Sequence, residues 1–223
     1  MAEFTGPKDL KEPTIEYWYA HFGPYLFHTT VKEEIVNRLK KEAYECTEKY
    51  NYGLAGHLDH QYLFPSDIKF WFYEIMTPIF TTYRKGHCKY HGFDYLPVEF
   101  AFADLWVNIM KAGDFNPPHY HGGNLSFVLF LSTPEGLEEE QKKFEGTSEA
   151  PGTITFEYGE TSSPHWSTVG KGFKPKVGSL YIFPSLLRHW VSPFKCAGDR
   201  VSVSGNLLIK EKKDFPWPKQ KYF

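Results

Sequence analysis

One stretch early in the chain repeats apolar residues at the spacing of an amphipathic helix. It covers residues 30–50, with Lys and Glu between the apolar positions Val31, Ile35, Leu39 and Ala43. Thr30 and Glu33 have the spacing of a capping box at its start. The pattern predicts a helix that lies on an apolar surface. Residues 17–28 before it are aromatic and are predicted to include an edge strand.

A second helix is predicted to start at Ser66, after a loop over residues 51–65. Its buried stripe is expected to consist of Ile68, Phe72, Ile75 and Ile79. Pro78 should kink or interrupt this helix, because proline lacks the N–H that the helix requires. Residues 86–95 are predicted to be irregular.

From Leu96 onward the pattern changes to short apolar runs typical of β-strands. Strands are predicted at residues 97–111, 125–132, 153–158, 177–183, 187–191 and 200–210, and residues 158–173 are predicted to form a long loop. Helices followed by strands without intervening helices indicate a mainly β fold with flanking N-terminal helices. We expect one domain over residues 1–223, with a helical flank in 1–95 and the β core in 96–210.

Two of these strands separate side chains of different kinds onto their two faces. In the first, Leu105, Val107 and Ile109 share one face, and Trp106, Asn108 and Met110 share the other. In the last, Val201 and Val203 oppose Arg200, Ser202, Ser204 and Asn206. This polar face either lines an anion pocket, where Arg offers a fork for a carboxylate, or faces water.

Composition narrows the class of protein. The net charge of −2 gives no electrostatic case for nucleic-acid or membrane-surface binding. The aromatic fraction of 18% predicts a core and any cleft built from large flat groups. Three widely spaced cysteines without a CxxC pair indicate free thiols in a reducing compartment. Because no apolar leader or membrane-spanning run is present, we expect a cytoplasmic protein.

The candidate chemistry centres on residues 116–123, NPPHYHGG. In an extended chain residues i and i+2 project from one face, so His119 and His121 would present two imidazoles about 6–7 Å apart at their backbones. Neutral imidazole suits iron, zinc, copper or nickel. His189, close after a later strand, is the natural third ligand, and three protein ligands leave positions open as catalytic sites do.

These segments resemble the Fe(II)/2-oxoglutarate-dependent oxygenases, and among them the prolyl-4-hydroxylase-like branch. AGDFNPPHYH resembles the family's approach to its first metal-binding histidine, GSLYIFPSLLRHWVSP its distal-histidine segment, and RVSVSGNL its final strand. The resemblance covers about residues 105–208. It implies a double-stranded β-helix, a jelly-roll or cupin-like barrel. It also implies a dioxygenase that hydroxylates a substrate with Fe(II), 2-oxoglutarate and O2.

Carried over residue by residue, the resemblance makes His119 and His189 iron ligands. Arg200 with Ser202 would hold the distal carboxylate of 2-oxoglutarate, and Asn108 would be a further cosubstrate contact. The chain departs from the family at His121, which stands where a carboxylate is expected. It also has Met110 and Phe130 where relatives have tyrosines. The aromatic residues Trp106, Tyr120 and Trp190 are candidates for shielding the site.

Several interpretations of His121 remain open. The site could use three histidines with 2-oxoglutarate, use three histidines without it, or hold zinc whose bound water is acidified for hydrolysis. Arg200 and Ser202 favour the first. A non-catalytic metal-binding module on the same fold is a further alternative. The resemblance suggests a peptidyl proline or another protein side chain as substrate, while nucleobases and small molecules stay open.

Overall fold

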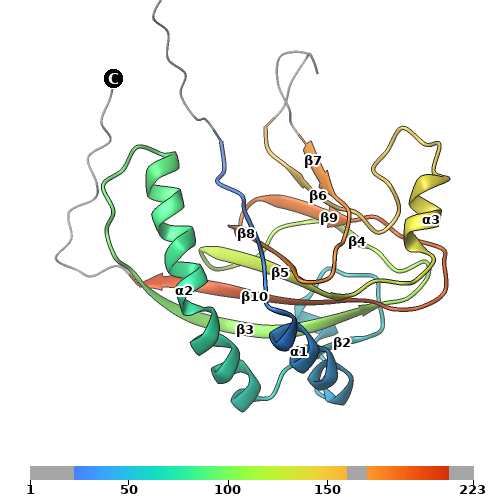
Figure 1. The fold of residues 1–223 in the computed structure, drawn as a ribbon, viewed down its shortest axis with the longest axis horizontal. Coiled ribbons are helices and arrows are strands. Elements are labelled where there is room, and N and C mark those ends of the chain that lie inside the picture. Colours follow the sequence, from blue (N-terminus) through green and yellow to red (C-terminus); the bar gives the residue numbers. More distant parts are fainter. Residues whose placement is uncertain (1–22, 160–169, 211–223) are drawn as a thin grey trace, which may run out of the picture.

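The computed structural model describes residues 23–159 and 170–210, and shows two antiparallel sheets with two long helices beside them (Figure 1). The helices are α1 (Glu33–Glu45), the 3-10 turn η1 (Asn51–Gly53), α2 (Ser66–Tyr90) and the short α3 (Leu137–Lys142). No helix in the described part of the chain is both long and apolar enough to cross a membrane.

The larger sheet has six strands in the order β1-β8-β5-β10-β3-β2. They are β1 (Phe27–Thr30), β8 (Ser179–Pro184), β5 (Leu125–Ser132), β10 (Arg200–Lys210), β3 (Glu99–Met110) and β2 (Gln61–Leu63). The smaller sheet has the order β4-β9-β6-β7. Its strands are β4 (Asn116–His119), β9 (Arg188–Val191), β6 (Ile154–Glu157) and β7 (Gly170–Phe173).

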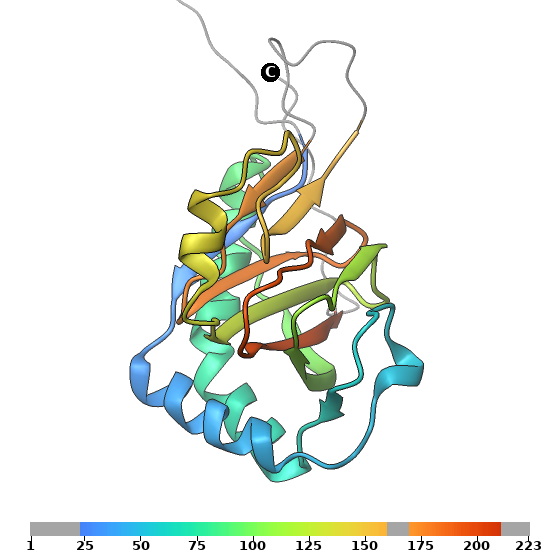
Figure 2. The ribbon, with the colours of Figure 1, turned by 90° about the vertical axis from the view of Figure 1, so that its right-hand side faces the viewer.

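This arrangement confirms the predicted mainly β, jelly-roll class, in which strands adjacent in space are mostly distant in sequence. The two sheets remain separate, however, and do not close into the barrel that the sequence suggested. Figure 2 shows them one above the other, with α1 and α2 beside the larger sheet. The division of residues 1–223 into a helical flank and a β core within one domain stays a prediction.

The two faces of the larger sheet have different roles, as the alternation in β3 and β10 predicted. Leu105, Val107, Ile109, Val201 and Val203 belong to the main core, together with Leu39 of α1 and Phe72, Met76 and Phe80 of α2. The opposite face of the same strands points toward the smaller sheet. There Arg200 and Ser202 are buried and Ser204 and Asn206 are half-buried, so the first half of the polar face of β10 is closed to water.

Both helices depart from the predicted boundaries. Helix α1 begins at Glu33 and has no side-chain cap. Thr30, the predicted cap, instead belongs to β1, where it pairs with Ser179 of β8. Helix α2 runs without interruption through Pro78 to Tyr90. Since Pro78 lies on the exposed side of the helix, water can satisfy the carbonyl that proline leaves without a partner. Residues 86–90, predicted to be irregular, are therefore helical.

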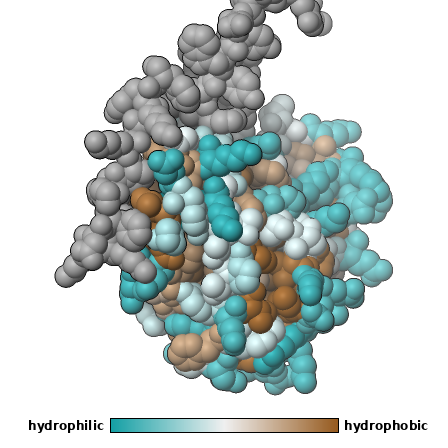
Figure 3. Space-filling view, turned by 60° about the vertical axis from the view of Figure 1, so that its left-hand side comes forward, coloured by the Kyte–Doolittle hydropathy of each residue, from teal (hydrophilic) through white to brown (hydrophobic). Residues whose placement is uncertain are grey.

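The predicted stripe of α2 is only partly the buried one. Ile68 and Phe72 are buried, but Met76 and Phe80 continue the stripe in place of Ile75 and Ile79. Ile75 and Ile79 instead line an open groove against α1, together with Ile35 and Trp71. Figure 3 shows apolar residues gathered on this face of the molecule.

Strands β2, β4 and β7 were not predicted, and all three lie at the edge of a sheet. Strand β4 contains Pro117 and Pro118, which an edge strand tolerates because it has one side without ladder hydrogen bonds. Strand β7 falls in the segment predicted to be a loop. The predicted aromatic edge strand corresponds to β1, although residues 17–22 of that prediction lie outside the described residues.

Candidate active site

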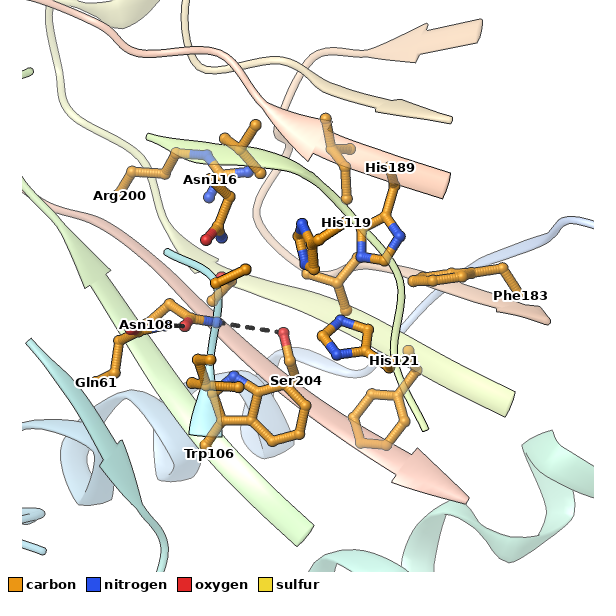
Figure 4. Close-up of a pocket in the computed structure, with 17 residues that line it drawn as sticks. Gln61, Trp106, Asn108, Asn116, His119, His121, Phe183, His189, Arg200 and Ser204 are labelled. Atoms are coloured by element: carbon orange, nitrogen blue, oxygen red, sulfur yellow. Dashed lines mark hydrogen bonds between the residues drawn. The ribbon is translucent and has the colours of Figure 1, made fainter. Parts of the chain in front are cut away.

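Three histidines converge between the sheets, from the end of β4, from the segment just after it and from β9. His119 ends β4 and pairs directly with His189 of β9, so their side chains leave adjacent strands at the same level. His121 follows two residues later, where its backbone N–H donates to the carbonyl of Ser185 at 2.9 Å. One ligand atom from each histidine lies within 4.8 Å of the others. The three rings face one another in Figure 4.

Backbone carbonyls fix the orientation of two of these rings. Nδ1 of His119 lies 2.6 Å from the carbonyl oxygen of Pro117, and Nδ1 of His189 lies 2.8 Å from that of Leu187. A carbonyl only accepts, so Nδ1 must be the protonated nitrogen that donates in both rings. The lone pair is then on Nε2, which is the state required for metal binding.

Burial keeps all three imidazoles uncharged at neutral pH. Burial first, and then the charge of neighbouring His119, lower the pKa of His121 to about 4 and that of His189 to about 3. Burial also lowers the pKa of His119, against the hydrogen bond to Pro117 that raises it. Three neutral imidazoles can therefore accept a metal ion near neutral pH without first losing protons.

Arg200 occupies the other end of the same pocket, at the start of β10. It is 1% exposed; Nε donates to the carbonyl of Gly152 at 3.1 Å, and Nη1 contacts Sδ of Met110 at 3.2 Å. Its Nη2 is buried and has no hydrogen-bond partner. Burial lowers the pKa of Arg200 to about 9, which still leaves it a cation at neutral pH. No carboxylate in the described residues forms an ion pair with it.

Met110 and Phe130, the two departures from the family's tyrosines, both contact Arg200. Met110 provides the sulfur contact, and the Phe130 ring centre lies 4.9 Å from the Cζ atom of Arg200. These side chains hold the guanidinium by packing and a cation–π contact, without offering it an oxygen. The orientation of Arg200 is therefore fixed while its Nη2 donor is left for another group.

Asn108 and Ser202 lie side by side on β3 and β10 and line the pocket. The Asn108 amide is held within the protein: its Oδ1 accepts from Nε2 of Gln61 at 2.8 Å, and its Nδ2 donates to Oγ of Ser204 at 3.3 Å (Figure 4). Gln61 was missed from sequence, because it comes from the short edge strand β2 inside a predicted loop. Only its tertiary contacts identify it.

Of the three candidates for an aromatic shield, one lines the pocket. Trp106 is buried and lines the pocket beside His121 (Figure 4). Tyr120 is 69% exposed, and Trp190 is not among the lining residues because its neighbour His189 takes the pocket face of β9. The lining there comes instead from Ile154, Phe183 and Val191.

Comparisons with known proteins agree with this arrangement. Residues 104–206 match the family model described as "Putative 2OG-Fe(II) oxygenase". Among solved structures, a Pseudomonas putida prolyl-4-hydroxylase is similar at 14% identity and a TM-score of 0.52, over 84% of this chain and 92% of that one. A 2OG-Fe(II) oxygenase family oxidoreductase from Burkholderia pseudomallei gives 12% identity and a TM-score of 0.52, over 82% and 84%. The sequence matches none of the curated proteins with which it was compared.

A third similar structure is the α-ketoglutarate-dependent epimerase SnoN from nogalamycin biosynthesis, at 10% identity and a TM-score of 0.53, over 82% of this chain and 78% of that one. The fold is thus that of the 2-oxoglutarate-dependent oxygenases. The family match together with this fold indicates a 2-oxoglutarate-dependent oxygenase, an enzyme whose cofactors are Fe(II) and 2-oxoglutarate and whose other cosubstrate is O2.

The residues present fit these two cofactors. Each of the three imidazoles offers one ring nitrogen as a ligand to a single metal ion, and a buried guanidinium has an unpartnered N–H donor in the same pocket. A carboxylate group bound in this pocket would satisfy that donor. The set departs from the usual one in having an imidazole, His121, where a carboxylate is expected, so no protein charge offsets the dipositive ion.

Proposed function

We propose that this pocket is the active site of a hydroxylase in which His119, His121 and His189 hold Fe(II) and Arg200 binds the distal carboxylate of 2-oxoglutarate. The observation that carries the proposal is the unpartnered, buried Nη2 of Arg200. A buried charge without a counter-charge is costly, and natural proteins keep such a group where a ligand completes it. Ser202 beside it on β10 supplies a hydroxyl to the same carboxylate.

Each part of the chain has a definite task in this proposal. The backbone carbonyls of Pro117 and Leu187 keep His119 and His189 in the metal-binding tautomer, and Trp106 and Phe183 keep water from the pocket. Asn108, held by Gln61, fixes the pocket wall between Arg200 and Trp106. When bound, Fe(II) and 2-oxoglutarate supply O2 activation, with oxidative decarboxylation to succinate and CO2 coupled to hydroxylation of a C–H bond.

For the substrate we propose a protein side chain, with peptidyl proline as the first candidate. The support is the prolyl-4-hydroxylase among the solved structures that share the fold, together with the resemblance of the motif segments. The net charge of −2 disfavours nucleic acid as the substrate.

For the compartment, three free cysteines support a reducing one such as the cytoplasm.

The test is 2-oxoglutarate turnover measured as succinate. The protein loaded with Fe(II) is expected to form succinate from 2-oxoglutarate and O2, slowly without a substrate and faster with a proline-containing peptide that it accepts. Arg200→Ala should abolish succinate formation, while Arg38→Ala on the exposed face of α1 should leave it unchanged. An Arg200→Ala protein that is folded and turns over like the wild type would overturn the proposal.

A second candidate is a three-histidine metal enzyme that does not use 2-oxoglutarate. The observation that favours it is the neutral donor set, which prefers softer ions such as zinc or copper over iron. The same assay separates the two. Metal binding that depends on His189, with no succinate formed under any condition, would identify the second candidate.

A further inference from the structure

A continuous series of ring contacts leads from the proposed metal site to the surface. The His121 ring lies 5.7 Å from the Trp106 ring, centre to centre, Trp106 lies 5.8 Å from Tyr50, and Tyr50 lies 5.6 Å from Tyr52. These separations are those of aromatic rings in direct contact. Trp106 is buried, Tyr50 is half-buried, and Tyr52 is 86% exposed.

The side chains in this series are of the kinds that release one electron most readily. Among the described residues, the other rings that contact the three histidines from outside the cluster are Phe156 and Phe183, both against His189. Phenylalanine does not give up an electron under conditions that oxidise Trp or Tyr. Among the described residues, Trp106 is therefore the oxidisable ring in contact with the three histidines, and its own next ring contact is Tyr50.

Tyr50 also has an acceptor for its proton. Its hydroxyl donates to Oδ2 of Asp104 at 2.9 Å. A tyrosine can give up an electron easily only if its phenol proton leaves with the electron. Burial, the hydrogen bond to Asp104 and the Asp104 charge raise the pKa of Tyr50 to about 12. The Tyr50 phenol is therefore protonated at neutral pH and donates that proton to the hydrogen bond with Asp104. Asp104 and Trp106 are two residues apart on β3, which fixes the Tyr50 contacts with both.

We propose that Trp106, Tyr50 and Tyr52, here called the aromatic path, conduct single electrons inward from the surface to the metal site. The inference rests on the proposed function. With Fe(II) and 2-oxoglutarate bound, an oxidising equivalent would be left in the site when O2 has been activated and no substrate consumes it. The aromatic path removes that equivalent before it destroys the histidines or Trp106, a side reaction that a closed active site must control.

Each step balances in electrons and protons. For each oxidising equivalent at the metal site, Trp106 would lose one electron and become a radical cation. Tyr50 gives one electron to Trp106 and its phenol proton to Asp104, which restores Trp106. Tyr52 then gives one electron to the Tyr50 radical, which recovers its proton from Asp104, while the Tyr52 proton goes to water. A thiol or enediol reductant in solution returns a hydrogen atom to Tyr52.

The experiment follows the radical itself. Protein loaded with Fe(II) and 2-oxoglutarate, without a substrate or reductant, is exposed to O2, frozen at successive times and examined by electron paramagnetic resonance, with ring-deuterated tyrosine to identify the signal. A parallel sample receives Fe(II) and hydrogen peroxide, which oxidises the metal without 2-oxoglutarate. Mass spectrometry then locates the oxidised side chains, and succinate is measured in the same samples.

The wild type should give a tyrosyl signal and oxidation products at Tyr52. Tyr50→Phe should lose the signal, and Tyr52→Phe should move oxidation inward to Tyr50 and Trp106 with several-fold more damage there. Tyr44→Phe is the matched control: Tyr44 is exposed and donates to Asp199 at 3.1 Å, but no ring contact among the described residues connects it to Trp106. It should behave like the wild type.

The outcomes distinguish the two proposals. Succinate without a tyrosyl radical, or a radical unchanged in both Tyr50→Phe and Tyr52→Phe, overturns the aromatic path and leaves the proposed function standing. A peroxide-dependent radical lost in Tyr50→Phe, with no succinate formed, supports the aromatic path and overturns the use of 2-oxoglutarate. Neither succinate nor radical overturns both.

Discussion

Arg200 carries the clearest consequence at the scale of single residues. Its guanidinium is buried and one of its donors is unsatisfied, so in the ligand-free protein it contributes little to stability or opposes it. We predict that Arg200→Met leaves the free energy of unfolding of the ligand-free protein within about 1 kcal/mol of the wild type or raises it, as replacing buried charges by apolar residues often does.

The same variant should lose the response to 2-oxoglutarate. In the presence of Fe(II) or a redox-inert substitute ion, 2-oxoglutarate at about 100 times its Kd should stabilise the wild type by roughly 2.7 kcal/mol, and Arg200→Met should show almost none of this. Denaturant unfolding with and without 2-oxoglutarate measures both quantities. Because Arg38 stacks on Trp71 and does not line the pocket, Arg38→Met is the control for the response to 2-oxoglutarate. Equal stabilisation of Arg200→Met would contradict the role given to Arg200.

His121 is the residue that decides the metal. We predict that His121→Asp shifts the preference of the site from zinc toward Fe(II), because a carboxylate offsets the charge of the ion and suits harder metals better than imidazole does. Competition between Fe(II) and Zn(II) for the metal-free protein, followed by metal analysis, measures the ratio. An unchanged ratio would mean that His121 does not contact the metal.

The side chains that line the candidate site were easier to predict from the sequence than the residues that hold them in place. The alternation in β10 predicted that Arg200 and Ser202 share one face, because side chains in a strand alternate regardless of what surrounds them. Gln61 could not be predicted. It holds Asn108 but lies 47 positions away in the chain, and a single glutamine in a loop-like segment carries no local pattern.

At the scale of elements, the long central strands were predicted and the short edge strands were not. Strands β3, β5 and β10 have enough alternating or apolar residues to be recognised. Strands β2, β4 and β7 have three or four residues each, and β4 contains two prolines. Pairing with a neighbour, not the local sequence, makes these segments extended. The uninterrupted course of α2 through Pro78 likewise depends on which side of the helix faces solvent.

Gly205 tests the packing at the middle of β10, between β3 and β5. A Cβ atom there would lie 2.7 Å from the Phe127 ring and 2.8 Å from the carbonyl oxygen of Asp104. We predict that Gly205→Ala lowers the free energy of unfolding by about 1–3 kcal/mol, the usual range for overpacking a close-packed interior. Gly170→Ala in β7, whose Cβ would have only an ordinary 3.7 Å contact, is the control. Equal stabilities in denaturant unfolding would show that the sheet yields easily at this point.

At the scale of the whole molecule, the buried histidines couple stability to pH. The pKa of His189 falls to about 3 and that of His121 to about 4 in the folded protein, below the value of about 6.5 for an unfolded histidine. The unfolded chain therefore binds more protons below pH 6.5, and each buried histidine removes up to about 1.4 kcal/mol of stability per pH unit as the pH falls. Above about pH 7.5 these groups should have no effect.

Denaturant unfolding of the metal-free protein at pH 7.5 and 5.5 checks this expectation. The wild type should be less stable at pH 5.5, His121→Gln should show a smaller difference between the two pH values, and His28→Gln in the exposed part of β1 should match the wild type. A wild type that is equally stable at both values would mean that the three histidines are open to water.

We propose that one pocket holds both Fe(II), on three histidines, and 2-oxoglutarate, on Arg200. The most direct measurement is an anaerobic titration of the metal-free protein with Fe(II) and then 2-oxoglutarate, followed by absorption spectroscopy. We expect a visible metal-to-ligand charge-transfer band that saturates at one equivalent of Fe(II), is absent in His189→Ala and is greatly weakened in Arg200→Met. Iron binding without that band would contradict the use of 2-oxoglutarate, and zinc binding without iron binding would contradict the metal as well.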